Sequence, residues 1–338
     1  MCGSGVYRYL LWASYDGARF LSITNGSSNY NVLSFLKALV RETFPDIANQ
    51  LKMSPSSRTD AGVHAIRNAF IMQIPIGNAD EGKSNLLDDW NHKANESIGA
   101  SLRILDFHTV SKGFCSRKNV SYRKYKYRLA IAKSEEQWLK NIEQPLLWQF
   151  AERPYIWFLP NGFDIRKAAD ACSLFQYIFT LSVLNSEKVL SFHGTHNMAS
   201  FMKYPRRNRL RTDICTATMR HMLHVGISGG RSRFGNADGF SLIDINVISR
   251  SFLRSQVRHM VRTIVEHAYG RLQRERLIWL LNNPNPENFH HFGMVTAPPQ
   301  GLFLEDVVYD ERMFINPVPY HYHNWDDAMD EMLFDEAF

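Results

Sequence analysis

The sequence is poor in cysteine and contains no long apolar run. Its 338 residues include four widely separated cysteines, without the CxxC spacing of a zinc or redox site. A disulfide framework is therefore not indicated. No apolar segment reaches the roughly 18 to 20 residues that cross a bilayer, and the amino terminus lacks the apolar core of a signal peptide. We expect an intracellular protein without a membrane association, located first of all in the cytoplasm.

Sequence patterns typical of nucleotide-binding and metal-binding sites are also missing. The sequence has no phosphate-binding glycine loop of the form GxxxxGK[ST] or GxGxxG. Two pairs of histidines, at 290–291 and at 321 and 323, lack a cysteine or carboxylate at a metal-ligand spacing. We therefore predict neither a metal site nor a cofactor.

Basic residues are in excess and gather in runs. The formal net charge is +6 and the apolar content is 45%, which is enough for a sizeable core. The basic runs lie at 117–128, 203–211 and 250–262. Clustered positive charge of this kind favours a polyanionic partner such as a nucleic acid.

Short strand-like and helix-like segments alternate without an internal repeat, which predicts an α+β fold of two α/β subdomains. The expected subdomains are residues 1–112 and 113–312, with an insertion near 175–193 and a tail at 313–338. The predicted strands are 7–15, 68–74, 101–110, 122–132, 219–225 and 241–248, and the predicted helices are 32–44, 85–98, 164–174 and a long helix from Ser251.

One carboxylate lies in a polar turn. The sequence Arg-Thr-Asp-Ala-Gly-Val-His-Ala occupies residues 58–65, between a serine-rich segment typical of a loop and an apolar segment typical of a buried strand. Arg58 and His64 are close enough in sequence to lie near Asp60, and a nearby cation keeps an aspartate ionised. Asp60 is then either a covalent nucleophile or a residue that caps the turn and pairs with Arg58 on the surface.

Residues 123–131 alternate between an apolar and a basic face, as in a half-buried strand. Tyr125 and Tyr127 lie on the apolar face. A tyrosine at such a position is either a core residue with a solvated hydroxyl or a ring that stacks on an RNA base. The basic face favours contacts with a nucleic acid. The residues of this segment expected to bind it are Arg123, Lys124 and Lys126.

Arginines recur every four residues from Arg250 to Arg262, opposite an apolar stripe, which predicts an amphipathic helix. Like charges at this spacing are mildly unfavourable. The stripe therefore indicates anionic neighbours, either RNA phosphates or Asp60, although a solvated helix face remains the alternative. Arg254 and Arg262 are candidates for phosphate contacts, which position RNA without reading its sequence.

Taken together, these motifs resemble the TruA-type family of tRNA pseudouridine synthases. Residues 58–65 resemble the segment that carries the family's catalytic aspartate. The segment 114–127 is similar to the family's Phe-x-x-Arg … Arg-x-Tyr-x-Tyr pattern, and 252–258 to its Phe-x-x-x-x-x-Arg pattern. Residues 194–201 and 297–304 resemble two further elements. The chain departs from the family at 21–23, where a Gly-Trp-Gln-like segment is usual, and in the insertion.

The resemblance implies a role for each matching residue. Asp60 is implied to be the nucleophile, and Tyr125 the active-site tyrosine. Arg258 is implied to pair with the aspartate, with Arg262 as the alternative if the register shifts by one turn. Arg58 would bind the RNA substrate next to the nucleophile, and Leu302 would line the site. In fold, the resemblance implies two related subdomains that share a mixed, mostly antiparallel sheet flanked by helices, with the active-site cleft between them.

In function, the resemblance implies a cofactor-independent enzyme that isomerises uridines of tRNA to pseudouridine, with tRNA as its partner and a homodimer as an option. The wording of the 252–258 motif is closer to eukaryotic pseudouridine-synthase-like members, some of which work in mitochondria. The alternative is a tRNA-binding or RNA-chaperone protein that keeps the basic surface without catalysis. The altered segment at 21–23 and the insertion favour this alternative, whereas the intact Asp60, Tyr125 and Arg258 favour catalysis.

Overall fold

The chain folds into two compact units. The structure is a computed structural model that describes residues 6–21, 23, 30–47, 49–77, 82–176, 178–184, 187–203, 218–235 and 237–322. Unit 1 comprises the chain up to Arg123 and the residues that follow Leu302, and unit 2 comprises Lys124–Leu302. Strands β5 (Val120–Ala132) and β12 (Leu302–Tyr309) run through the two boundaries. The expected subdomain boundary near residue 112 stays a prediction.

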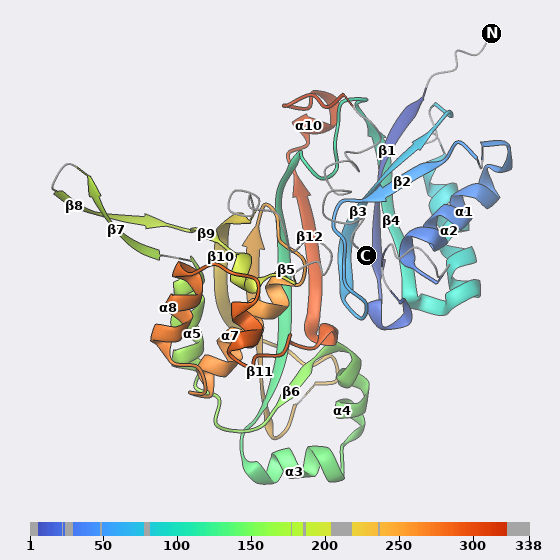
Figure 1. Cartoon of the computed structure of the whole chain (residues 1–338). Helices are drawn as coiled ribbons and strands as arrows, with labels where there is room; N and C mark the ends of the chain where they lie inside the picture. The colour runs from blue at the N-terminus through green and yellow to red at the C-terminus, as the bar shows by residue number, and fades with distance from the viewer. Residues whose placement is uncertain are drawn as a thin grey trace. The chain divides into compact units, whose positions relative to one another are not determined.

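Unit 1 contains a mixed sheet with helices beside it (Figure 1). Its strand order is β4-β1-β3-β12, and β2 also pairs with β3. Strand β1 is antiparallel to both β3 and β4, whereas β12 runs parallel to β3, with Phe303 opposite His64. The elements are β1 (Tyr7–Tyr15), η1 (Gly17–Arg19), α1 (Val32–Thr43), η2 (Pro45–Ile47), β2 (Lys52–Pro55), β3 (His64–Ile74), α2 (Lys83–Ile98), η3 (Gly99–Ser101), β4 (Leu102–Val110) and α10 (Arg312–Ile315).

The sequence explains these elements locally. The apolar run of β3 is buried from Asn68 to Met72, as expected for a strand covered on both faces. Helix α1 begins after Asn31, whose side-chain oxygen accepts a hydrogen bond from Ser34 N–H at 2.8 Å. Such a cap satisfies one of the unpaired donors of the first helical turn. The helix then buries Leu36 and its apolar neighbours.

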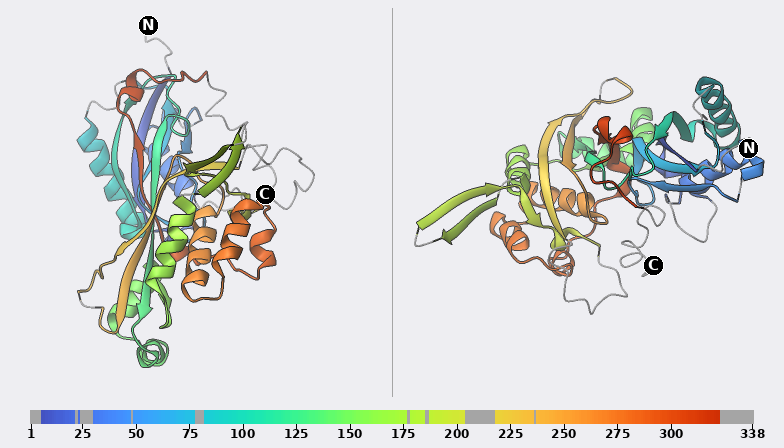
Figure 2. Two further views of the ribbon diagram at one scale, coloured as in Figure 1. Left: turned by 90° about the vertical axis from the view of Figure 1, so that its left-hand side faces the viewer. Right: turned by 90° about the horizontal axis from the view of Figure 1, so that it is seen from above.

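Unit 2 has a second group of strands, in the order β5-β11-β10-β9, with β6 parallel to β5. Helix α5 packs against β10 and α7, and Figure 2 shows it in lime beside the orange helices α7 and α8. The elements are α3 (Glu135–Glu143), α4 (Leu147–Glu152), η4 (Arg153–Tyr155), β6 (Trp157–Leu159), α5 (Ile165–Gln176), β9 (Thr195–Asn197), η5 (Ala199–Phe201), β10 (Met219–Gly229), β11 (Phe240–Ser249), α7 (Gln256–Ala268), α8 (Arg274–Asn282), α9 (Asn288–His291) and η6 (Pro299–Gly301).

The expected α+β class is confirmed, and each predicted strand and helix is found: the strand at 7–15 has the predicted ends, and the other elements have shifted ends. One prediction was wrong in a way that matters for the site. The helix expected from Ser251 begins at Gln256, because Ser255 has a left-handed φ of 57° and the Gln256 side chain accepts a hydrogen bond from Leu253 N–H at 2.8 Å. Arg254 therefore precedes the helix, and the expected four-arginine stripe is reduced to Arg258 and Arg262.

The segment expected to be an insertion, residues 175–193, contains a hairpin. Strands β7 (Ile178–Leu184) and β8 (Glu187–His193) pair antiparallel and make a two-stranded sheet of their own. This hairpin lies between α5 and β9 in the chain, and its being an insertion stays a prediction. Of the expected basic run 203–211, residues 204–211 lie outside the described residues, and so do residues 323–338 of the expected tail.

Candidate active site

Asp60 lies in the turn between β2 and β3 of unit 1. Its carbonyl accepts a hydrogen bond from Val63 N–H at 3.1 Å, and Gly62, inside this turn, has a φ of 78°. That conformation favours glycine, because a Cβ would be strained there. The Asp60 side chain is half-buried and Arg58 is exposed. The turn therefore holds a carboxylate and a guanidinium two residues apart, at a place that solvent reaches.

The turn rests on the end of β1. A Cβ added to Gly17 would lie 2.0 Å from the Val63 carbonyl oxygen, so only glycine allows this close approach. The imidazole of His64 lies with Nδ1 3.0 Å from the carboxylate of Asp16 and stacks on Phe303 with a centroid distance of 4.7 Å. The sequence placed His64 near Asp60. In the structure, His64 together with Asp16 and Gly17 supports the turn.

Arg123 lies beneath the same segment. It is 7% exposed, its Nε donates to Ser57 Oγ at 2.6 Å, and one of its terminal nitrogens donates to the Ser56 carbonyl at 2.8 Å. A guanidinium used in this way holds two residues that precede Asp60. Burial therefore favours a structural role for Arg123 over the RNA contact that the sequence suggested.

In unit 2, the two tyrosines of β5 share its buried face, as the alternation predicted. Tyr125 is 7% exposed and packs edge-on against Phe252, with ring centroids 5.1 Å apart. The Tyr127 hydroxyl donates to the Pro298 carbonyl at 2.6 Å. Burial raises the pKa of Tyr127 well above its usual range, although the charges of Arg258 and Arg262 act in the opposite direction. Tyr127 therefore stays protonated and keeps this hydrogen bond.

The segment that ends at Leu302 joins Arg258 to the tyrosine strand. Arg258, on α7, donates through Nε to the Ala297 carbonyl at 2.8 Å. A Cβ on Gly301 would lie 2.6 Å from the Tyr127 ring, so this segment packs directly on β5. Leu302 itself is buried. The structure thus brings together, within unit 2, the elements that carry Tyr125, Arg258 and Leu302, whereas Arg58 and Asp60 belong to unit 1.

The remaining basic candidates differ in their surroundings. Arg262 forms an ion pair with Glu266 at 2.8 Å and lies 5.6 Å from the Trp157 ring centroid. Lys126 has its Nζ 3.8 Å from Asp244, and Lys124 is half-buried. Arg254 is exposed. The structure therefore compensates the charges of Arg262 and Lys126 in part, a feature that the sequence alone did not indicate.

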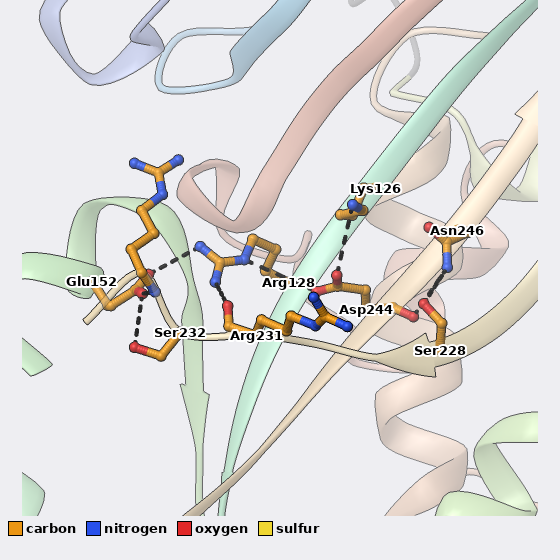
Figure 3. A network of polar contacts seen from close by, with 9 residues as sticks. Lys126, Arg128, Glu152, Ser228, Arg231, Ser232, Asp244 and Asn246 are labelled. Carbon is orange, nitrogen blue, oxygen red and sulfur yellow. Dashed lines mark hydrogen bonds and ion pairs between the residues drawn. The ribbon is translucent and has the colours of Figure 1, made fainter. Parts of the chain in front are cut away.

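A buried ion pair lies on the basic side of β5 (Figure 3). Arg128 donates to Glu152 at 2.9 Å and to the Arg231 carbonyl at 2.7 Å. Glu152 also accepts hydrogen bonds from Arg233 N–H and from the Ser232 hydroxyl. The pair thus fixes the β10–β11 loop, which places Arg231 and Arg233 at the surface. Sequence analysis missed Glu152, because nothing in a short helix identifies its partner 24 residues earlier.

Two features of the described residues bear on other functions. No helix in this part of the chain is long and apolar enough to cross a membrane. Among the same residues, no three histidine, cysteine, aspartate or glutamate side chains gather in an arrangement that could hold a metal ion.

Comparison with known proteins shows which family the chain is similar to. Residues 189–310 match a family model described as tRNA pseudouridine synthase. This match begins in strand β8 and continues through α7 and β12, so it covers the elements that carry Arg258 and Leu302.

Individual relatives extend the similarity over most of the chain. The tRNA pseudouridine synthase-like 1 of Xenopus laevis is 28% identical over 309 residues, which cover 90% of this chain and 91% of the relative. The mouse protein of the same name is 27% identical over 317 residues, covering 91% and 96%. The tRNA pseudouridine synthase A of Thermus thermophilus is 25% identical over 311 residues, covering 90% and 98%. These matches confirm the resemblance to TruA-type tRNA pseudouridine synthases, at modest identity.

Proposed function

We propose that this protein is a tRNA pseudouridine synthase that isomerises specific uridines of tRNA without a cofactor, with Asp60 as the nucleophile. The observation that carries the proposal is the turn at residues 58–65. It places a solvent-accessible carboxylate next to an exposed arginine on a tightly supported loop, within a chain whose relatives are named tRNA pseudouridine synthases. A carboxylate held in this way is suited to attack on carbon.

The reaction breaks the bond between N1 of uracil and C1′ of the ribose and forms a bond between C5 and C1′. Asp60 would attack either C1′ or C6 and would be released when the rotated base is rejoined, so no atoms are gained or lost. The proton on C5 leaves to a base and N1 gains one. Because the target uridine is stacked in RNA, it must first be flipped out at a cost of a few kcal/mol.

The other proposed site residues act around this step. Tyr125 would stack on the flipped uracil, and aromatic stacking contributes about 1 to 3 kcal/mol per base. Arg258 would orient Asp60 and favour its ionised form, while Arg58 would hold the RNA strand from which the base has left. Lys124, Lys126, Arg254 and Arg262 are proposed contacts to phosphates of a tRNA partner. Sedimentation of the free protein tests the proposed homodimer.

Tritium release from tRNA labelled at C5 of uracil tests the activity. We expect release by the unaltered protein in the presence of EDTA and none by Asp60→Ala. Release by both proteins would show that Asp60 is not the nucleophile. Binding of total tRNA without release by either protein would favour a non-catalytic tRNA-binding or RNA-chaperone function.

The role of Arg258 needs a separate test. If Arg258 serves Asp60, Arg258→Ala abolishes tritium release while the Kd for tRNA changes little. Equal losses of binding and turnover would instead assign Arg258 to a phosphate contact.

A further inference from the structure

A buried polar network lies directly under the Asp60 turn. Between β2 and Asp60 the side chains alternate, although this stretch is not a strand: Ser57 and Thr59 are 5% and 7% exposed, whereas Arg58 is exposed and Asp60 is half-buried. Two hydroxyls therefore point into the protein on either side of Arg58. A buried hydroxyl needs a hydrogen-bond partner, so the partners of these two side chains fix the position of the turn.

Tyr15 and Asn68 form hydrogen bonds with the part of this segment that lies nearest to Asp60. The Tyr15 hydroxyl lies 2.9 Å from Thr59 Oγ1. The Asn68 side-chain nitrogen donates to Tyr15 Oη at 3.1 Å and to the Ser57 carbonyl at 2.9 Å. Asn68 is fully buried and Tyr15 is 4% exposed.

The directions of the hydrogen bonds of Asn68 follow from the donors available. The Ser57 carbonyl can only accept, and the side-chain oxygen of Asn68 accepts from Ala69 N–H at 2.9 Å. The Asn68 amide orientation is therefore fixed, with both N–H groups used. Tyr15 Oη accepts from Asn68, and either hydroxyl can supply the proton of the Tyr15–Thr59 hydrogen bond.

A second anchor holds the start of the turn. Arg123 binds Ser56 and Ser57, and the Tyr309 hydroxyl lies 2.8 Å from Ser56 Oγ and 2.5 Å from the Ser116 carbonyl. Tyr309 is buried, and this burial raises its pKa far above neutrality, so it remains a donor. With both anchors, the backbone is held from Ser56 to Thr59, and Asp60 is the first residue beyond them.

We propose that Tyr15 and Asn68 are positioning residues for Asp60: through Thr59 and Ser57 they fix the turn that carries the nucleophile before RNA binds. This inference rests on the proposed function. The chemical step requires the carboxylate at one place, and a displacement of about 1 Å costs about 100-fold in rate. Because the network acts on the turn through Ser57 and Thr59, its loss should lower kcat and leave tRNA binding intact.

The chain offers a matched pair of variants. Tyr15→Phe removes only the hydroxyl that meets Thr59. Tyr9→Phe removes a hydroxyl from the same strand, where it donates to the Ile76 carbonyl at 2.7 Å, and Tyr9 is also buried. Tyr15→Phe loses two buried hydrogen bonds, with Thr59 and with Asn68, whereas Tyr9→Phe loses one that is partly buried. We expect kcat to fall about 10- to 100-fold in Tyr15→Phe and to stay within about twofold in Tyr9→Phe, with KM and the Kd for tRNA unchanged in both.

Thr59 gives a second pair in case Tyr15→Phe folds poorly. Thr59→Val keeps the shape and removes the hydroxyl, whereas Thr59→Ser keeps the hydroxyl. Thr59→Val should reproduce the loss of kcat and Thr59→Ser should restore most of it. Equal kcat values for the unaltered protein, Tyr15→Phe and Thr59→Val would overturn the proposal.

Hydrogen exchange separates this proposal from the proposed function. Mass spectrometry should show faster amide exchange in residues 57–63 of Tyr15→Phe than of Tyr9→Phe, whether or not tRNA is turned over. If the unaltered protein releases no tritium from any tRNA but exchange is faster in Tyr15→Phe, the anchoring stands and the proposed function fails. If exchange in this segment is the same in both variants, the anchoring itself is refuted.

Discussion

Removal of the Glu152 carboxylate should destabilise unit 2 strongly. The Glu152 side chain is 1% exposed and that of Arg128 is 9% exposed, with 2.9 Å between the charged atoms. Loss of one partner of a buried ion pair costs about 3 to 5 kcal/mol, because the other charge is left without compensation. In Glu152→Ala, the carboxylate of Asp244 still lies 4.0 Å from Arg128. The cost should therefore be near the lower limit, about 3 kcal/mol.

Thermal unfolding measures this cost. For a unit of this size, 1 kcal/mol corresponds to about 2 to 4 °C in Tm, so Glu152→Ala should lower the Tm of unit 2 by about 6 to 12 °C. The loop after β10 should also exchange its amide hydrogens faster, since Arg233 N–H donates to Glu152 at 2.8 Å. The matched control is Glu136→Ala. Its ion pair with Lys140 is 2.6 Å long but both side chains are more than half exposed, so no measurable change is expected.

A double variant distinguishes an unpaired charge from a packing defect. Replacing the pair with apolar residues, as Arg128→Met with Glu152→Leu, removes both charges and should recover much of the lost Tm. A Tm for Glu152→Ala within 1 °C of the unaltered protein would refute the reasoning. A double variant that is less stable than Glu152→Ala would show instead that the hydrogen bonds to the loop, rather than the buried charge, dominate the cost.

Three further predictions concern single residues. Gly17→Ala should lower stability by about 1 to 3 kcal/mol, because the added Cβ meets the Val63 carbonyl, and should slow tritium release; an unchanged Tm contradicts this contact. Burial lowers the pKa of His196 from 6.5 to about 4, so the contribution of its neutral form to stability is complete above about pH 6.5, and up to about 3 kcal/mol is lost as the pH falls toward 4. His196→Gln should therefore show a smaller loss of Tm between pH 7.5 and pH 5 than the unaltered protein. Equal losses of Tm would refute this. Burial raises the pKa of the Cys172 thiol to about 12, so iodoacetamide at pH 8 should label it only after unfolding, as mass spectrometry of the native protein can check.

Sequence patterns predicted those parts of the fold that depend on neighbours along the chain. The alternation along β5 correctly placed the tyrosines on a buried face, because successive side chains of a strand point in opposite directions. The prediction from the arginine spacing was wrong at the start of α7. Four arginines at helical spacing look the same whether or not the backbone is helical at Ser255, whose left-handed conformation ends the pattern. Periodicity constrains the side chains of an existing helix, but it does not determine where that helix begins.

Sequence patterns could not predict the contacts that support the candidate nucleophile, and the reason is a different one. Serine and threonine next to a proline and a glycine are typical of exposed turns, and the sequence gives no sign that Ser57 and Thr59 are buried. Their partners lie far away in the chain: Tyr15 is 44 residues from Thr59, and Arg123 is 66 residues from Ser57. Only the pairing of β1 with β3 brings Tyr15 near Asn68 and so completes the network. The motif thus identifies the candidate nucleophile, whereas its position depends on tertiary contacts, which is why a variant of Tyr15 is more informative than another variant of Asp60.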